Sequence, residues 1–121
     1  MWYLASPYTH TNRAIMHARF CVMQEATCIL AREGINIFSP IVHWHESSQK
    51  FDLPTDAMYW QKVNYDTFQR CDGMYLLTLP GWEESVGVQM ELGWAEGKPD
   101  FHIHYMCPNN LDTFKHFEKM L

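Results

Sequence analysis

The sequence predicts a single α/β domain, in which a parallel sheet of about four strands lies between layers of helices. Short apolar runs alternate with longer segments of helical periodicity along the whole chain. Strands that alternate with helices indicate parallel pairing through right-handed crossovers. The chain has 121 residues and contains no repeat, low-complexity tract or linker, which fits one domain over residues 1–121.

The first strand and the first helix follow from the start of the chain. Trp2–Ala5 is an apolar run that ends at Ser6-Pro7, as a buried strand followed by a loop would. From Ala14 to Arg32, apolar residues recur at helical spacing, with Asn12 available as the N-cap. Gly34 then ends the helix, because a glycine commonly follows the last helical turn.

The next part of the chain contains a strand, an irregular stretch and a helix. Ile35–Phe38 is expected to form the second strand, ended by Ser39-Pro40. Residues 41–55 are rich in polar residues and lack a clear period, so we expect a long functional loop. A helix is expected from 56 to 70.

The third strand is expected at Met74–Leu79, which is nearly all apolar, as a central parallel strand should be. Pro80-Gly81-Trp82 then breaks the chain. The remaining expected elements are a helix from Glu83 or Ser85 to about Gly97, a strand from His102 to Met106, and a closing amphipathic helix from Leu111 to Leu121.

The loops after the strands are the expected place for a ligand. In open parallel sheets, ligands bind outside the carboxyl ends of the strands. Ser6-Pro7-Tyr8, Ser39-Pro40 and residues 80–87 each follow an expected strand. These segments should therefore meet at one edge of the sheet.

Composition and charge narrow the function classes. The formal net charge is −5, which argues against binding of a nucleic-acid polymer but permits binding of a single nucleotide. No apolar stretch is long enough to cross a membrane, and the start of the chain does not resemble a signal peptide, so we expect a cytoplasmic protein. The four cysteines form no CxxC pair, which predicts reduced and mostly buried thiols.

The segment from Gly81 to Glu91 has a pattern that suits chemistry at a sugar. Ser85 and Gly87 lie at a helix N-terminus, whose free N–H groups can hold an anion such as phosphate. Gly87 precedes Glu91 by one turn, so a substrate lying over that turn would meet the carboxylate. A carboxylate there can attack a sugar carbon as the base departs, as in retaining glycosidases. Periodicity alone favours the alternative, an exposed helix glutamate.

Five motifs follow one another along nearly the whole chain: YLASPY at 3–8, FSPIVH at 38–43, CD at 71–72, LPGWEESVGV at 79–88 and ELGWAEGKP at 91–99. In this order they resemble the nucleoside 2-deoxyribosyltransferase-like superfamily, and most of all a phage and bacterial branch long catalogued as a domain of unknown function. They are also similar to the 2'-deoxynucleoside 5'-phosphate N-hydrolases. The resemblance implies a Rossmann-like or flavodoxin-like three-layer sandwich.

The resemblance also implies roles for particular residues. It places the nucleophile at Glu91 and the contact to a 5'-phosphate at Ser85. It implies no cofactor, a nucleoside or nucleotide as the ligand, and a homodimer or higher homo-oligomer whose sites are often completed by a neighbouring subunit. The residues that it implies around the nucleoside are Tyr3, Ser6, Pro7 and Tyr8.

One position departs from the superfamily pattern. The superfamily usually has an Asp eight residues before the Asp that precedes the third strand, and here that position is Asn64. An asparagine can hydrogen-bond but cannot act as an acid or base. Asp66 is nearby but lies about 200° around the helix from Asn64, so it fills the role only if the alignment slips by one turn.

Further pocket residues are expected from the loops at the same edge. Ser39, Pro40 and His43 follow the second strand, and His43 is either a pocket residue or a solvated histidine. Trp82 and Trp44 either stack on a base or pack at a subunit contact. We expect the helical tryptophans, Trp60 and Trp94, in the core or at an interface.

Other chemistries are not favoured by the sequence. His43 with His45, and His102 with His104, form HxH pairs, but no Cys or acidic residue is spaced to complete a metal site. The nucleophile elbow GxSxG, the dinucleotide motif GxGxxG and the Walker loop are absent. We therefore expect no bound metal.

These observations predict hydrolysis of the N-glycosidic bond of a nucleotide or nucleoside, with Glu91 attacking C1' of the sugar through a covalent intermediate. Asn64 or Asp66 would assist, and the general acid is not identified. One alternative is a deoxyribosyltransferase that exchanges bases. The other is a nucleotide-binding or sequestering protein that has lost catalysis, which Asn64 favours.

Overall fold

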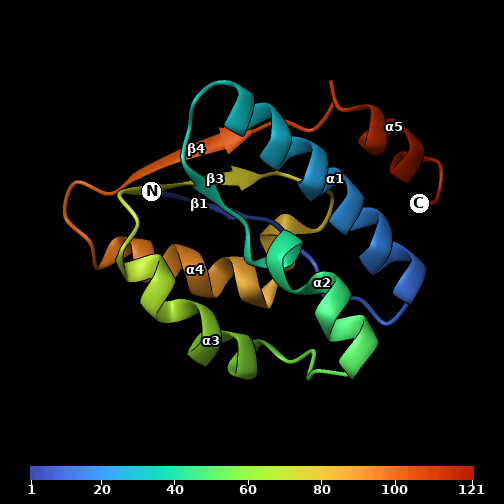
Figure 1. The fold of residues 1–121 in the computed structure, drawn as a ribbon, viewed down its shortest axis with the longest axis horizontal. Coiled ribbons are helices and arrows are strands. Elements are labelled where there is room, and N and C mark those ends of the chain that lie inside the picture. Colours follow the sequence, from blue (N-terminus) through green and yellow to red (C-terminus); the bar gives the residue numbers. More distant parts are fainter.

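A computed structural model describes all 121 residues and confirms the α/β fold class (Figure 1). Its four strands form one all-parallel sheet in the order β2-β1-β3-β4. The register pairs Ala5 with Leu76 and Leu77 with Met106, so three of the strands end at a common edge. The strands are β1 (Trp2–Ala5), β2 (Ile37–Phe38), β3 (Gly73–Leu77) and β4 (His102–Met106).

Helices cover both faces of the sheet (Figure 1). They are α1 (Arg13–Arg32), α2 (Pro40–Phe51), α3 (Ala57–Gln69), a 3₁₀ turn η1 (Trp82–Glu84), α4 (Val86–Glu96) and α5 (Asp112–Glu118). Helices α1 and α5 pack together on one face, and α3 and α4 on the other. Helix α2 packs beside α1.

Alternate residues of β1 belong to two separate cores. Leu4 faces the core under α1 and α5, whereas Tyr3 and Ala5 face the core under α3 and α4. This alternation follows from the period of two in a β-strand. The buried strand residues explain why apolar runs identified β1 and β3 in the sequence.

The expected loop at residues 41–55 is wrong, because most of it forms α2. Ser39 caps this helix by accepting a hydrogen bond from Val42 N at 3.1 Å, and Pro40 occupies its first turn. Serine before proline fits a helix start as well as a loop. The helix ends at Asp52, which has a left-handed backbone with φ of 54°.

The other expected elements are present, with shifted ends. Strand β2 has only two residues, because Gly34 (φ of 84°) turns the chain before Ile35 and Asn36. Helix α4 begins at Val86, with Ser85 as its N-cap, after the 3₁₀ turn that the sequence did not reveal.

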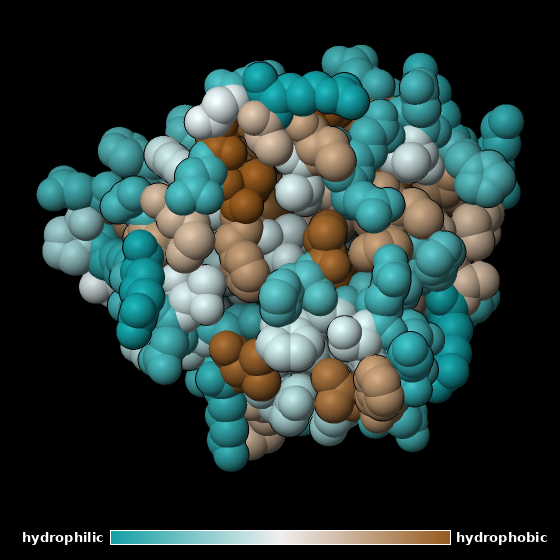
Figure 2. Space-filling model, viewed as in Figure 1, coloured by the Kyte–Doolittle hydropathy of each residue, from teal (hydrophilic) through white to brown (hydrophobic).

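The thiols differ from the expectation. All four cysteines are free, but only Cys71 is buried, whereas Cys28 and Cys107 are exposed and Cys21 is partly exposed. None of the helices has the length and apolar character needed to cross a membrane. Figure 2 shows hydrophilic side chains around the rim of one face and apolar ones gathered toward its middle.

Candidate active site at the carboxyl edge of the sheet

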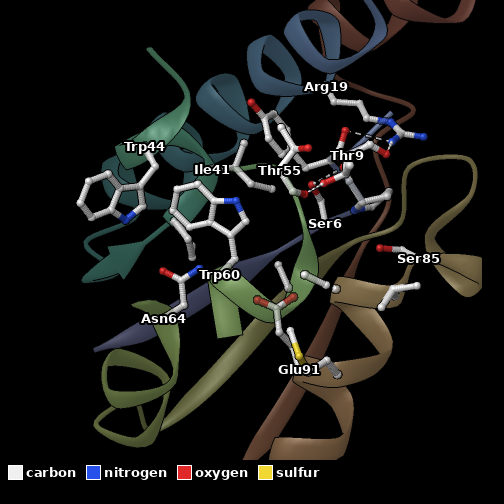
Figure 3. A pocket seen from close by; sticks show the side chains of 18 of the residues that line it. Ser6, Thr9, Arg19, Ile41, Trp44, Thr55, Trp60, Asn64, Ser85 and Glu91 are labelled. Carbon is white, nitrogen blue, oxygen red and sulfur yellow. Dashed lines mark hydrogen bonds between the residues drawn. The ribbon is translucent and has the colours of Figure 1, made fainter. Parts of the chain in front are cut away.

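A cavity of about 510 Å³ lies at the carboxyl edge of the sheet (Figure 3). Its walls come from the loop after β1, the start of α2, the start of α3, the loop after β3 and the first turns of α4. The segments that the sequence placed at this edge therefore do meet. The volume lies in the range of small-molecule sites.

Glu91 is the carboxyl group on the α4 wall of the cavity. Its side chain is enclosed by protein and reaches solvent only in part. Burial raises the pKa of Glu91 from the ordinary 4.5 to about 7, and the hydroxyl of Tyr3 opposes the rise. The alternative of an exposed helix glutamate is wrong, because the Glu91 side chain is only partly exposed and lies in the cavity wall.

Tyr3 lies behind Glu91 rather than in the cavity wall. It is 0% exposed and packs edge-on against Phe68. Burial, and then the adjacent Glu91, raise the pKa of Tyr3 well above its ordinary value. The Tyr3 hydroxyl has no well-formed hydrogen bond. The expected contact of Tyr3 with substrate is therefore replaced by a contact with the carboxyl group.

One end of the cavity suits an anion. Ser85 Oγ accepts a hydrogen bond from Val88 N at 3.2 Å and starts α4, whose dipole is positive there. A side chain at Gly87 would approach the nearest atom, Ser85 Oγ, only to 4.0 Å, so the first turn is open. A ligand can therefore approach the backbone amides at this helix start.

Arg19 of α1 adds a full positive charge at this end (Figure 3). Its Nη1 donates to the carbonyl oxygens of Tyr8 and Thr9, each at 3.1 Å. Its Nε is buried without a partner, and Arg19 has no ion pair in the structure. Burial lowers the pKa of Arg19. A desolvated cation without a carboxylate partner favours an anionic ligand.

The other end of the cavity is aromatic. Trp44 of α2 and Trp60 of α3 line it, with ring centroids 5.8 Å apart and planes inclined by 52°. Asn64, one turn after Trp60, is 8% exposed, and its amide makes no hydrogen bond in the structure. Figure 3 shows the two indoles side by side, with Asn64 close to Trp60 and Glu91 further along the cavity.

His45 is part of the wall but is already engaged on both ring nitrogens. Its Nδ1 lies 2.6 Å from the hydroxyl of Tyr8, and its Nε2 lies 3.2 Å from Nδ1 of His17. The ring stacks on Phe20 at 4.2 Å between centroids. Burial, and then His17, lower the pKa of His45, so a neutral ring is favoured.

A comparison with known protein families finds one whose model matches this chain. Residues 1–104 match the model of DUF1937, which is described as a domain of unknown function. The chain belongs to the DUF1937 family. The matched segment holds all the residues that line the cavity. No match to the chain was found among curated proteins.

In the DUF1937 fold, five of the expected site residues lie outside the cavity wall, and Tyr3 behind Glu91 is the first of them. Ser39 is buried as the cap of α2, and His43 is exposed on the same helix. Trp82 packs near Tyr105, with centroids 5.9 Å apart. Asp66 is exposed on α3, outside the cavity wall, so it does not take over from Asn64. The expected residues that do line the cavity are Ser6, Pro7, Tyr8, Pro40, Asn64, Ser85, Gly87 and Glu91.

Several lining residues were not expected as site residues or were placed elsewhere. Trp60 and Trp94, expected in the core or at an interface, line the cavity of this DUF1937 chain, as does Trp44, which is helical. Arg19 was missed, although the sequence carries a signal. It interrupts the apolar stripe that α1 turns toward the core, so it must face inward.

The histidine pairs do not form a metal site. His43 and His45 are two residues apart on a helix, so their side chains diverge by about 200° instead of sharing a face. His102 and His104 do share one side of β4 and are exposed. No group of three His, Cys, Asp or Glu residues is placed to hold a metal ion.

Proposed function

We propose that this protein hydrolyses the N-glycosidic bond of a nucleotide, with Glu91 as the nucleophile. The observation that carries the proposal is the position of Glu91 between the cationic end and the aromatic end of one cavity. A nucleotide has the same order of parts: phosphate, sugar and base. Arg19, Ser85 and the start of α4 would hold the phosphate, and Trp44 and Trp60 would contact the base.

The reaction would follow the two steps of a retaining glycosidase. Glu91 forms a bond to C1' as the bond from C1' to the base nitrogen breaks, and a water molecule then attacks C1' and releases the carboxylate. Tyr3 fits this sequence, because its hydroxyl can donate to the carboxylate whenever Glu91 is ionised. The hydrogen bond would lower the free energy of the charged form that attacks.

The pH dependence of turnover tests this role of Glu91. A nucleophile must be ionised, and the pKa of Glu91 is raised to about 7. We therefore expect kcat/KM to rise with pH up to about 7 and to level off above it. A general acid at the same position would give the opposite slope, and a fall of kcat/KM through this range would contradict the mechanism.

A pair of variants on one helix tests the nucleophile directly. The protein is incubated with a panel of nucleoside 5'-phosphates, and released base is measured by chromatography. Glu91→Gln should lower kcat by at least about 1,000-fold, because it removes the attacking group. Glu96→Gln, at an exposed position of the same α4, is the matched control and should leave turnover unchanged. Retained turnover in the Glu91 variant would refute the proposal.

A second candidate function is nucleotide binding without catalysis, and Asn64 is the observation that favours it. The amide occupies the position where the resembled superfamily has an acid, and an amide transfers no proton. Calorimetry separates the two candidates. A binding protein gives a saturable heat with a nucleoside 5'-phosphate while chromatography detects no free base after prolonged incubation.

A further inference from the structure

We propose that the departing base is a pyridinium ring that carries a carboxamide, so that the substrate is a pyridinium nucleotide whose glycosidic nitrogen is positively charged. This inference rests on the proposed function and specifies its substrate. It comes from the aromatic end of the cavity, where Trp44, Trp60 and Asn64 meet.

The aromatic end offers no proton for a neutral base. The Asn64 amide cannot serve as an acid. Both nitrogens of His45 are engaged, and the Tyr8 hydroxyl is one of their partners. Two further carboxyl residues line the cavity, but Asp56 and Glu84 are exposed, and the Asp56 carboxylate accepts a hydrogen bond from Tyr59 N at 3.1 Å.

A cationic base departs without any acid. When the bond between C1' and the pyridinium nitrogen breaks, its electron pair passes to the ring nitrogen and cancels the positive charge. A neutral pyridine carboxamide then leaves, while a Glu91 oxygen bonds to C1'. Water next attacks C1', the carboxylate is restored, and the proton of the water goes to solvent. Atoms and charge balance with no proton donated to the base.

The walls suit this base in two respects. Indole faces attract cations, and the attraction is strongest for tryptophan. The Asn64 amide has one donor side and one acceptor side, both without partners. A primary carboxamide has the same two groups and can pair with it reciprocally. An amide at position 64 thus fits a carboxamide better than a carboxylate would.

One acidic residue of the rim lies near the end assigned to the base. Asp56 is the N-cap of α3, one turn before Trp60, and lines the same cavity. The other, Glu84, is exposed at the end of η1 beside Ser85. A pyridinium nucleotide is negative at its phosphate, where Arg19 lies, and positive at its base, where Asp56 supplies a negative charge.

A direct comparison of substrates tests the inference with the unmodified protein. Nicotinamide mononucleotide is compared with the 5'-monophosphates of adenosine, cytidine and uridine, and released base is measured at equal concentrations. General acids contribute about 100-fold or more to rates, so kcat/KM for the pyridinium nucleotide should exceed the others by at least about 100-fold. Equal or faster cleavage of a neutral base, dependent on Glu91, would overturn this inference and leave the proposed function intact. Absence of cleavage for every nucleotide would refute both.

An isosteric variant gives an independent measurement. Asn64→Asp restores a carboxyl group that can donate a proton, so it should raise kcat/KM for the neutral-base nucleotides and narrow the preference at least about 10-fold. Nicotinic acid mononucleotide, with a carboxylate in place of the carboxamide, should bind the unmodified protein more weakly than nicotinamide mononucleotide. Thermal unfolding checks that the variant folds. A preference that Asn64→Asp does not change would refute the role of Asn64.

Discussion

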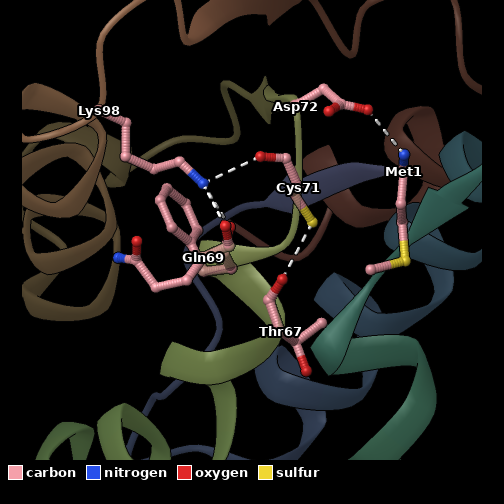
Figure 4. A network of polar contacts seen from close by, with 7 residues as sticks. Met1, Thr67, Gln69, Cys71, Asp72 and Lys98 are labelled. Atoms are coloured by element: carbon pink, nitrogen blue, oxygen red, sulfur yellow. Dashed lines mark hydrogen bonds and ion pairs between the residues drawn. The ribbon is translucent and has the colours of Figure 1, made fainter.

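The two edges of the sheet differ in the hydrogen bonding of their polar groups. At the amino edge, Lys98 Nζ donates to the carbonyl oxygens of Phe68, Gln69 and Cys71 at 3.3, 2.6 and 3.0 Å, and Cys71 Sγ donates to Thr67 O (Figure 4). At the carboxyl edge, the Nε of Arg19 and the hydroxyl of Tyr3 are buried without a hydrogen-bond partner.

This difference separates the groups that stabilise the fold from those that lie in the cavity wall or directly behind it. Buried polar groups without partners lower stability, so a folded protein retains few of them. Here they gather around one cavity that also holds a carboxyl with a raised pKa. We infer that the polar contacts at the amino edge increase the free energy of unfolding, whereas the polar groups at the carboxyl edge decrease it and serve function.

The largest effect on stability should come from the pH dependence that Glu91 confers. The unfolded chain releases this proton near 4.5 and the folded protein near 7. Between these values the folded state binds more protons, so the free energy of unfolding should fall as pH rises, by about 3 kcal/mol in total, and level off above about pH 7. Urea unfolding gives the free energy of unfolding of wild type and of Glu91→Gln at pH 5 and at pH 8. The wild-type value minus the variant value should be smaller at pH 8, and the decrease measures the contribution of Glu91.

The Glu96→Gln variant is again the control, because Glu96 is exposed on α4. The free energy of unfolding of Glu96→Gln should differ from that of wild type by the same amount at both pH values. If the free energy of unfolding of Glu91→Gln relative to wild type were also the same at both pH values, the Glu91 carboxyl would be solvated. Glu91 would then no longer support the contrast between the two edges.

The next largest effect should come from Arg19. Arg19→Met keeps the bulk of the side chain but removes the charge, so KM for a nucleoside 5'-phosphate should rise about 30-fold, equivalent to about 2 kcal/mol of charge-assisted hydrogen bonding. Binding of the corresponding nucleoside without phosphate should not change. Arg32→Met, in the exposed last turn of α1, is the matched control. An equal loss for both ligands would show that Arg19 maintains the fold of the cavity instead of binding phosphate.

At the amino edge, Lys98→Met should lower stability without changing catalysis. The variant removes three charge-assisted hydrogen bonds to the end of α3 and its following turn, which we expect to lower the free energy of unfolding by about 1.5 kcal/mol. Lys62→Met, on the exposed side of α3, should change it by less than about 0.5 kcal/mol. Turnover of folded Lys98→Met below the unfolding temperature should match wild type.

The sequence predicted the fold because the relevant patterns are local. Apolar runs located β1, β3 and β4, and topology then required their carboxyl ends to meet at one edge. Helix α2 was missed because Ser39-Pro40 has the composition of a turn and also of a helix start. The wrong prediction came from a sequence pattern that is compatible with more than one local structure.

The candidate site was only partly predictable, because it depends on contacts between distant segments. The meeting of Trp44 with Trp60 requires α2 to be a helix and to lie against α3 at a particular angle. The burial of Glu91 depends on the cavity walls, since its own helix is apolar on several sides and gives no clear inward face. Arg19 is the exception, because a charge within the apolar stripe of α1 could have been recognised.

The smallest effect should come from Asp72, although it belongs to the same amino edge as Lys98. Its carboxylate lies 3.0 Å from the amino group of Met1 but is 76% exposed (Figure 4). Exposed ion pairs contribute about 0–1 kcal/mol and weaken with salt, so Asp72→Asn should change the free energy of unfolding by less than about 0.5 kcal/mol. Urea unfolding at low and high salt measures this change. A larger loss would mean that the start of β1 depends on this pair, and that stability at the amino edge comes from charge pairing as well as from the carbonyl contacts of Lys98.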